Sequence, residues 1–294
     1  MTSLLDRMTE DMEVHNLAAT TQTSYRLQVT QFARYFHKPI DDLEQLTFQD
    51  IRAYQVHLTR EKNLAPNSIG VAVCALRFLY KYTLHKDWNF DTVIPAPRSP
   101  RTLPVVLSPV EVERFLDAIP HLRDRTILTI CYAAGLRVSE AVNLKIGDID
   151  SQRMVLRVDQ GKGRRDRYVM LSPKLLEMLR KWWRQLRPPQ LLFPGEHPDQ
   201  AISVHTVQLA AKRARAASGI AKPITPHSMR HAFAVHLLES GVDVRTIQLL
   251  LGHRSLATTA QYLRIAANKV CAAVSPFDRL GSPQSTEVKT EATR

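Results

Sequence analysis

Apolar residues in the first ninety positions recur at helical spacing, and this region is predicted to contain helices only. One series places its apolar side chains three and four residues apart: Tyr25, Val29, Phe32 and Phe36. Residues at these intervals lie on one face of a helix. Thr20 and Thr21 stand before the series and are predicted to cap this helix at its N-terminus.

Two further helices in this region carry start signals. Thr47 and Asp50 have capping-box spacing, and the apolar residues that follow at helical intervals are Ile51, Tyr54 and Leu58. Pro66 opens the next helix, whose apolar stripe consists of Val73, Leu76, Leu79 and Tyr80. Arg77 and Lys81 lie four apart and share a face of that helix. Either a solvated surface or a phosphate-contacting face fits this pair.

The composition changes at residues 91–105, which hold four prolines and two arginines. Proline is excluded from helix interiors and biases the preceding residue toward extended backbone. The stretch is therefore predicted to be a stiff linker between an N-terminal helical domain, residues 1–90, and a second domain, residues 106–274. Residues 275–294 are rich in polar residues and predict a flexible C-terminal tail.

The second domain adds a β-hairpin to a helical pattern. Helices are predicted to begin at Ser108 and Arg137 and to span residues 124–134, 172–184 and 206–218. Residues 153–159 and 166–171 are rich in β-forming residues and flank a basic, glycine-rich turn, residues 160–165. The predicted fold class is mainly α with a small β-hairpin (α+β).

Charge is unevenly distributed along the chain. The 294 residues include 40 Lys and Arg and 28 Asp and Glu, which give a net charge of +12. Residues 1–90 hold ten of each kind, so the whole excess lies in residues 91–294. This asymmetry favours a polyanion as the partner of the second domain. Taken alone, it leaves DNA, RNA, heparin and an acidic membrane surface open.

Other features narrow the cellular context. No apolar run approaches the roughly 20 residues of a membrane span, and the mixed, acidic N-terminus differs from a secretory signal. A cytoplasmic protein is expected. The three cysteines, Cys74, Cys131 and Cys271, lie far apart in apolar contexts and form neither a metal motif nor a disulfide framework. They are predicted to be buried free thiols.

Residues 225–262 carry the main chemical signal. Thr225 is a predicted N-cap and Pro226 the first helical residue, which places His227 and Arg230 on one face of the first turn. A helix N-terminus attracts phosphate through its free N–H groups and its dipole. The predicted buried stripe of this helix is Met229, Phe233 and Leu237.

Two more polar residues follow in the same segment. A helix capped by Asp243 ends at Gly252, and His253 comes directly after it. Ser255 starts a short turn that carries Tyr262. A tyrosine hydroxyl can attack a phosphate and hold it covalently, while Arg and His stabilise the charge that develops. His231 and His236 are predicted to make local hydrogen bonds or packing contacts, and no third ligand completes a metal site.

These motifs together resemble the tyrosine recombinases of the phage integrase family, from the N-terminal helical domain to Tyr262. The family's active site has an arginine in a G-L-R-x-S-E context, a β-hairpin lysine, an H-x-x-R pair, a histidine or tryptophan after L-G, and a tyrosine. The matching residues in this chain occur in the same order: Arg137, Lys162, His227, Arg230, His253 and Tyr262. Six matches are a specific signal, although any one alone is weak.

The resemblance implies a role for each residue. Tyr262 would attack the scissile phosphate, form a 3′-phosphotyrosyl bond and free a 5′-hydroxyl. Arg137 and Arg230 would bind the non-bridging oxygens. Lys162 would protonate the leaving oxygen, His227 would accept the tyrosine proton, and His253 would hydrogen-bond the phosphate. Glu140 would support the site by orienting a basic residue. The resemblance implies no metal and no other cofactor.

The same resemblance implies a clamp on double-stranded DNA, formed by an N-terminal SAM-like core-binding domain and a catalytic domain. The expected DNA-contacting residues are Arg77, Lys81, Arg98, Arg101, Arg164, Arg165, Lys212, Arg213 and Arg215. Recombination joins two duplexes with four active sites, so a homotetramer is expected in the synaptic complex, on nucleoid DNA. Two rival functions stay open at this point: a type IB-like topoisomerase and a catalytically silent DNA-binding regulator.

Overall fold

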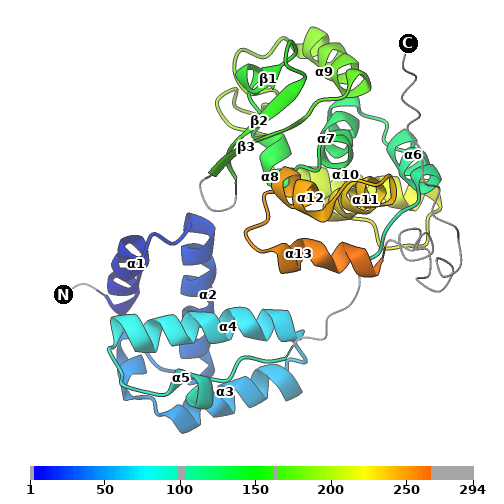
Figure 1. Ribbon diagram of the computed structural model, residues 1–294. Helices are drawn as coiled ribbons and strands as arrows, with labels where there is room; N and C mark the ends of the chain where they lie inside the picture. The colour runs from blue at the N-terminus through cyan, green and yellow to red at the C-terminus, as the bar shows by residue number, and fades with distance from the viewer. Residues whose placement is uncertain (1–2, 99–103, 162–164, 266–294) are drawn as a thin grey trace, which may run out of the picture. The chain divides into compact units, whose positions relative to one another are not determined.

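The computed structural model describes residues 3–98, 104–161 and 165–265, with the backbone only at Gln160, Gly161 and Arg165. The chain divides into two compact units, Met1–Arg101 and Thr102–Arg294 (Figure 1). The division falls inside the stretch predicted as a linker. Lys162, Arg164, Arg101 and the predicted tail lie outside the described residues, as does Cys271.

The N-terminal unit consists of helices around one apolar core. Its elements are α1 (Leu4–Val14), α2 (Ala19–Tyr35), η1 (Ile40–Gln45), α3 (Phe48–Arg60), α4 (Pro66–Phe78), η2 (Leu79–Thr83) and α5 (Phe90–Val93). Phe32 is fully buried, and Tyr54 packs edge-on against it with ring centroids 5.0 Å apart. The Tyr80 hydroxyl donates to the backbone oxygen of Leu43, 2.9 Å away. This bond joins η2 to η1.

Local start signals place two of these helices as predicted. Thr47 and Asp50 form a capping box at the start of α3, and Ile51, Tyr54 and Leu58 are buried. Pro66 begins α4. The predicted cap of α2 is wrong, because the helix begins at Ala19 after Ala18, which has no side-chain cap bond. Thr20 and Thr21 therefore lie in its first turn.

Two details of this unit differ from the simple sequence pattern. Residues 90–93 form α5, and Ile94 is fully buried in the N-terminal core. The first part of the proline-rich stretch therefore packs with the N-terminal unit. Cys74 is exposed and not buried as predicted, because it faces away from the stripe of α4. Cys131 is buried, and burial raises the pKa of its thiol to about 12.

The C-terminal unit is mainly helical with one small sheet. Its elements are α6 (Pro109–Asp117), α7 (Leu122–Ala133), α8 (Val138–Val142), η3 (Ile146–Asp148), β1 (Ile149–Asp150), β2 (Val155–Gly161), β3 (Arg165–Met170), α9 (Pro173–Leu186), α10 (Val204–Ser218), α11 (Pro226–Glu239), α12 (Val244–Leu251), α13 (Leu256–Ala260) and η4 (Gln261–Arg264). Ser108 caps α6 as predicted and forms a capping box with Glu111.

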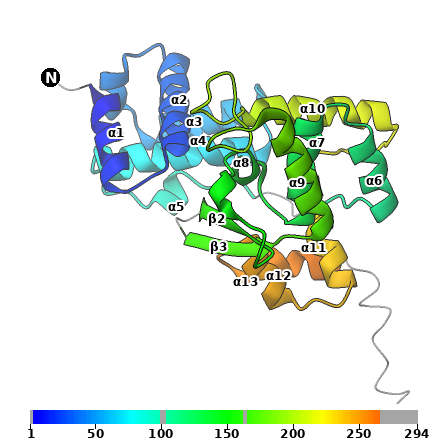
Figure 2. The same ribbon diagram turned by 90° about the horizontal axis from the view of Figure 1, so that it is seen from above.

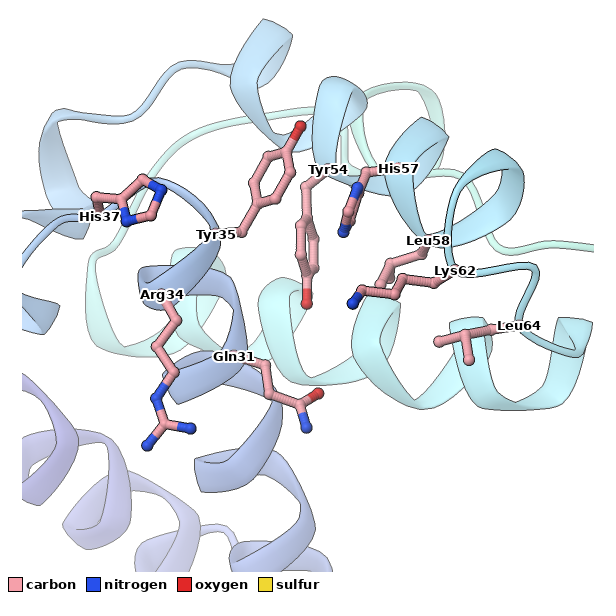
Figure 3. Close-up of a pocket in the computed structure, with 9 residues that line it drawn as sticks. All are labelled: Gln31, Arg34, Tyr35, His37, Tyr54, His57, Leu58, Lys62 and Leu64. Carbon is pink, nitrogen blue, oxygen red and sulfur yellow. The ribbon is translucent and has the colours of Figure 1, made fainter.

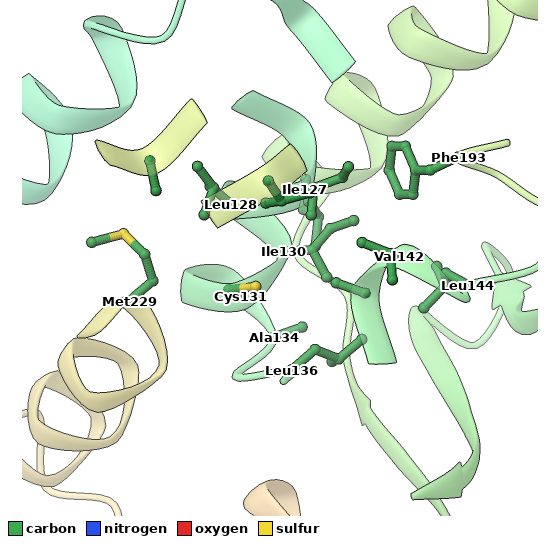
Figure 4. Packing of buried hydrophobic residues seen from close by; sticks show 14 of the residues in the cluster. Ile127, Leu128, Ile130, Cys131, Ala134, Leu136, Val142, Leu144, Phe193 and Met229 are labelled. Carbon is green, nitrogen blue, oxygen red and sulfur yellow. The ribbon is translucent and has the colours of Figure 1, made fainter. Parts of the chain in front are cut away.

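Helix α7 is the central element of this unit, and it packs against α6, α8, α9, α10 and α11. Its residues Ile127, Ile130 and Cys131 are fully buried. Figure 4 shows these side chains between Met229 of α11 and Phe193. Because α7 carries apolar residues around most of its circumference, it can be covered on several sides at once.

The predicted hairpin is confirmed, and the sheet has one more strand than expected. β2 pairs antiparallel with β3, and the two-residue strand β1 pairs with the other edge of β2, in the order β1-β2-β3. The register between β2 and β3 shifts between Val158 and Gly161. β2 contacts α8 and β3 contacts α12 (Figure 2). These contacts attach the hairpin to the helix that follows Arg137 and to the helix that precedes His253.

In the part of the chain that the structure describes, no helix is both long and apolar enough to cross a membrane.

Candidate functional site

The first turn of α11 is organised as its sequence predicts. The Thr225 hydroxyl accepts from the backbone N–H of Ser228, and the Ser228 hydroxyl accepts from the N–H of Thr225. Pro226 is the first helical residue, so His227 and Arg230 lie in the first turn. Met229 and Phe233 are buried as predicted, whereas Leu237 is only half-buried. The buried surface also includes residues between these positions, because α11 is covered on several sides.

Arg230 is the most deeply buried charged residue of the site, with 1% of its surface exposed. Its two terminal nitrogens donate to the backbone oxygens of Gly135 and Leu251, each 2.5 Å away. Burial and the neighbouring Arg137 lower its pKa to about 10, so the guanidinium is still charged at neutral pH. Arg230 therefore joins α11 to the α7–α8 loop and to the end of α12.

Glu140 provides the negative charge that three arginines share. Its carboxylate accepts from the Arg137 backbone N–H at 2.8 Å and from the Arg137 side chain at 2.7 Å. Arg167 donates both terminal nitrogens to it, at 3.0 and 2.7 Å, and Arg230 lies 3.8 Å away. The contacts confirm that Glu140 orients basic residues. Burial raises the pKa of Glu140, but the hydrogen bonds and charges of Arg167 and Arg137 outweigh it and lower the pKa to about 2.

Arg167 is a site residue that the sequence reasoning missed. It lies on β3, with only 11% of its side chain exposed, and its Nε also donates to the backbone oxygen of Leu250 at 2.9 Å. The guanidinium fork suits such two-pronged binding of a carboxylate. The signal in the sequence was the position of Arg167 in a strand that follows the basic turn. Its partner Glu140 lies 27 residues away, so no local pattern connects the two.

Tyr262 lies in η4, directly after α13, and is 1% exposed. Its ring packs in a small apolar cluster with residues of α11 and α12 that include Phe233 and Leu251. Its hydroxyl oxygen is 2.8 Å from Nδ1 of His231. Burial raises the pKa of the phenol, and the charges of Arg230 and Arg137 oppose that rise.

Three histidines surround this tyrosine and the arginines. Burial lowers the pKa of His227, and Arg230 and Arg137 add to the effect. Burial, together with the same two arginines and other neighbours, lowers the pKa of His253 to about 4. His253 Nδ1 lies 2.8 Å from the Thr259 hydroxyl. The rings of His227 and His231 meet edge-on with centroids 4.2 Å apart. Burial and neighbouring groups also lower the pKa of His231, to about 4, so all three rings are neutral at pH 7.

The structure therefore brings together five of the six predicted catalytic residues: Arg137, His227, Arg230, His253 and Tyr262. Each arginine acts on the pKa of the tyrosine and of the nearby histidines, which places all five in one electrostatic environment. The sixth, Lys162, lies outside the described residues. Among the residues that are described, no cluster of three potential metal-ligating side chains occurs.

Some of the predicted DNA-contacting residues already bind other groups of the protein, and others have exposed side chains. Arg77 donates to the backbone oxygen of Ile94 and to Asp91, at 2.8 and 2.9 Å. Arg215 donates to the backbone oxygen of Ala221 at 3.1 Å. The exposed members of the set are Lys81, Arg98, Lys212 and Arg213. Of Arg165 only the backbone is described, at the start of β3. Their contact with DNA stays a prediction.

A separate cavity of about 610 Å³ occurs in the N-terminal unit. Figure 3 shows its lining of aromatic and basic side chains, which includes Tyr35, Tyr54, His57 and Lys62. The His57 ring lies 4.4 Å from that of Tyr35, and its Nδ1 pairs with Glu61 at 2.8 Å. None of the six predicted catalytic residues lines this cavity, so it is distinct from the candidate site.

Comparison with known families agrees with the motifs. The phage integrase family matches residues 106–269, and the SAM-like N-terminal domain of phage integrases matches residues 4–90. A Sinorhizobium fredii protein, y4qK, described only provisionally as an integrase/recombinase, is 59% identical over 97% of this chain and 92% of its own length. The tyrosine recombinase XerD of Lacticaseibacillus casei is 34% identical over 85% of this chain and 89% of its own.

Solved structures show the same two-domain fold. A crystal structure of XerA recombinase is 29% identical, covers 92% of this chain and 99% of its own, and has a TM-score of 0.53. A post-cleavage complex of the XerH recombinase with a palindromic difH substrate has a TM-score of 0.70 at 23% identity, over 91% of this chain and 83% of its own. At that identity the likeness concerns the fold alone.

Proposed function

Because this chain belongs to the phage integrase family and is a tyrosine site-specific recombinase, we propose that it cuts and rejoins DNA through a 3′-phosphotyrosine bond to Tyr262. The observation that carries this proposal is the convergence of Arg137, Arg230 and Tyr262 within one buried site. Two guanidinium groups beside a phenol are suited to a phosphodiester that gains negative charge as it reacts.

The proposed chemistry proceeds without metal or ATP. The Tyr262 oxygen attacks phosphorus and gives its proton to a neighbouring histidine as the bond to the 5′-oxygen breaks. One phosphoester thus replaces another, and the bond energy is kept for rejoining. Arg137 and Arg230 neutralise the non-bridging oxygens, and His253 hydrogen-bonds one of them. Lys162 gives its proton to the departing 5′-oxygen. Glu140 keeps Arg137 in place through two hydrogen bonds.

We further propose that four copies act together on two duplexes. Support comes from a structural neighbour, a lambda integrase tetramer bound to a Holliday junction, which shares the fold with a TM-score of 0.71 at 22% identity. The proposed substrate is a double-stranded recombination site in nucleoid DNA, which places the protein in the cytoplasm. Contacts by the basic residues of α10 and the hairpin tip belong to this proposal.

The test uses DNA from the protein's own locus, first footprinted to find the bound site. A nick near the predicted cleavage point lets the released fragment diffuse away, so the covalent complex accumulates. Wild-type protein is expected to form an adduct that survives denaturation in the presence of EDTA, and Tyr262→Phe is expected to form none. After proteolysis, the released strand should carry a free 5′-hydroxyl that a kinase labels directly.

The controls separate binding from chemistry. Tyr262→Phe is expected to bind the site with nearly the wild-type affinity, because it lacks only one oxygen. If wild-type protein binds its site but never forms the adduct, the proposed chemistry is refuted and a DNA-binding regulator is favoured. Relaxation of supercoiled DNA by protein that never brings two sites together would favour the topoisomerase.

A further inference from the structure

His231 contacts the nucleophile, although it is not one of the six residues of the motif. Its Nδ1 lies 2.8 Å from the Tyr262 hydroxyl oxygen, and the two rings meet with centroids 5.6 Å apart. His231 follows His227 by one helical turn on α11, so both rings face the same side of the helix. No hydrogen bond joins His227 to Tyr262 among the described residues.

The protonation states set the direction of this contact. Burial, His227, Arg230 and His253 lower the pKa of His231 to about 4, so its ring is neutral at pH 7. The phenol pKa is raised, so Tyr262 is protonated. A neutral imidazole with its proton on Nε2 presents a lone pair at Nδ1, and the phenol can donate to it. A general base must lie within hydrogen-bond reach of the proton it removes.

We propose that His231, rather than His227, accepts the proton of the Tyr262 hydroxyl when the phenol oxygen attacks DNA. This inference rests on the proposed phosphotyrosine chemistry. As the Oη–P bond forms and the P–O5′ bond breaks, the phenol proton moves to Nδ1 of His231 and leaves an imidazolium. The departing 5′-oxygen takes its proton from the general acid, and rejoining returns each proton along the same path.

The entry of DNA makes His231 a better acceptor. In the free protein the charged Arg230 acts on this ring and opposes a positive charge on it. A bound phosphate brings negative charge beside the arginines, which offsets their repulsion of an imidazolium. The proton acceptor is therefore weak before substrate binds and stronger once it is bound. The contact lies within one unit, between α11 and η4.

The decisive variant is His231→Asn, because the Asn amide oxygen can occupy the position of Nδ1 and accept a hydrogen bond but cannot hold the proton. Its single-turnover rate of adduct formation on nicked DNA is expected to fall about 100-fold, within the range of general-base catalysis. The rate of the His231→Ala variant is expected to fall at least as far. When a more acidic fluorotyrosine replaces Tyr262, the loss caused by His231→Asn is expected to shrink to about 10-fold or less.

His236→Asn is the matched control on the same helix. His236 Nε2 donates to the backbone oxygen of Leu107 at 2.9 Å, so its Nδ1 accepts from the Tyr132 hydroxyl, also at 2.9 Å. This variant makes the same change at a comparable histidine–tyrosine bond that involves none of the proposed catalytic groups. Its cleavage rate is expected to stay within about threefold of the wild type. Thermal unfolding and DNA affinity, measured for every variant, identify losses caused by misfolding.

Several outcomes would overturn the inference. A His231→Asn variant as fast as wild type, or a loss that fluorotyrosine leaves unchanged, would show that His231 only packs. Faster cleavage by His231→Ala would show that the contact stores the tyrosine in an inactive position. If His227→Ala responds to fluorotyrosine and His231→Asn does not, His227 is the acceptor. Failure of wild-type protein to form any adduct would instead refute the proposed function itself.

Discussion

At the scale of single residues, the site depends on one carboxylate that offsets several buried positive charges. Glu140 is 7% exposed in its side chain and contacts Arg137, Arg167 and Arg230. A buried ion pair costs desolvation energy, and that cost is offset only where geometry and hydrogen bonds are good. The bidentate bond from Arg167 meets this condition. The guanidinium groups can then stay fixed and charged before a phosphate binds.

The lowered pKa of Glu140 predicts a specific loss of stability in acid. Its value falls from about 4.5 when unfolded to about 2 in the fold, so the folded state binds fewer protons between these limits. The stabilisation is complete above the unfolded pKa and is lost as pH falls through the folded one. The expected loss from this group is about 3 kcal/mol. Urea unfolding at pH 2 to 5 measures it.

Glu140→Gln provides the comparison. It removes the titrating group and leaves three arginines without their shared anion, so it should destabilise the protein by about 3 kcal/mol at pH 7. The difference in unfolding free energy between wild type and this variant should narrow between pH 4.5 and pH 2. An equal difference at every pH would mean that the carboxylate does not hold its charge in the fold as described.

At the scale of elements, the loop between α7 and α8 connects the core to the site. Gly135 has a φ of 64°, in the left-handed region that glycine adopts without strain. A Cβ built there would lie 2.4 Å from ring carbons of Phe233 on α11. The backbone oxygen of the same residue accepts from Arg230. The close approach of the loop to α11 therefore allows Arg230 to reach it.

Gly135→Ala tests this approach against Gly219→Ala. Gly219, which ends α10, has a similar φ of 66°, but its added Cβ would meet no atom within 4 Å. The free energy of unfolding of the Gly219 variant is expected to fall by about 1 kcal/mol, from the cost of the left-handed backbone alone. The Gly135 variant is expected to lose about 2 kcal/mol more, from the clash with Phe233, and to cleave DNA more slowly. Equal losses in chemical denaturation would contradict the close packing.

Some helix boundaries could be predicted because the signals that set them are local. Capping boxes at Thr47 and Ser108, and the Thr225-Pro226 start of α11, are local signals within four residues, so the sequence located those helices. The start was predicted less accurately for α7 and for α10, which begins at Val204 after the capping residue Ser203, two residues before the predicted start. Helix α7 begins at Leu122 without a side-chain cap, two residues before the predicted start. The strand β1 was missed because a two-residue strand has no periodicity of its own.

At the scale of the whole molecule, the two units differ in charge. Met1–Arg101 holds 12 basic and 11 acidic residues, a net charge of +1. Thr102–Arg294 holds 28 basic and 17 acidic residues, a net charge of +11. Each unit has its own apolar core. The electrostatic attraction to DNA is therefore expected to come mainly from the unit that carries the candidate site.

Binding dominated by phosphate contacts should weaken steeply with salt. Lys212 is exposed on α10, and Lys212→Gln is expected to make the slope of log affinity against log salt shallower by about 0.9, the effect of one lost phosphate contact. Lys222→Gln is the control, because Lys222 is already paired with Glu111 at 2.6 Å. Fluorescence anisotropy over a salt series measures both slopes. An unchanged slope for Lys212→Gln would remove this residue from the DNA interface.

By itself, the sequence determined the helical class of the protein, the hairpin, the proline-rich boundary region and the six-residue motif. These follow from periodicity, caps and spacings that act over a few residues. Only the tertiary structure decided which groups touch: Arg167 with Glu140, Arg230 with the Gly135 and Leu251 carbonyls, and His231 with Tyr262. The reason is physical. Such partners lie 21 to 95 residues apart. The packing of α11 against α7, α12 and η4, and of the hairpin against α8, brings them within hydrogen-bond reach, and no local pattern predicts it.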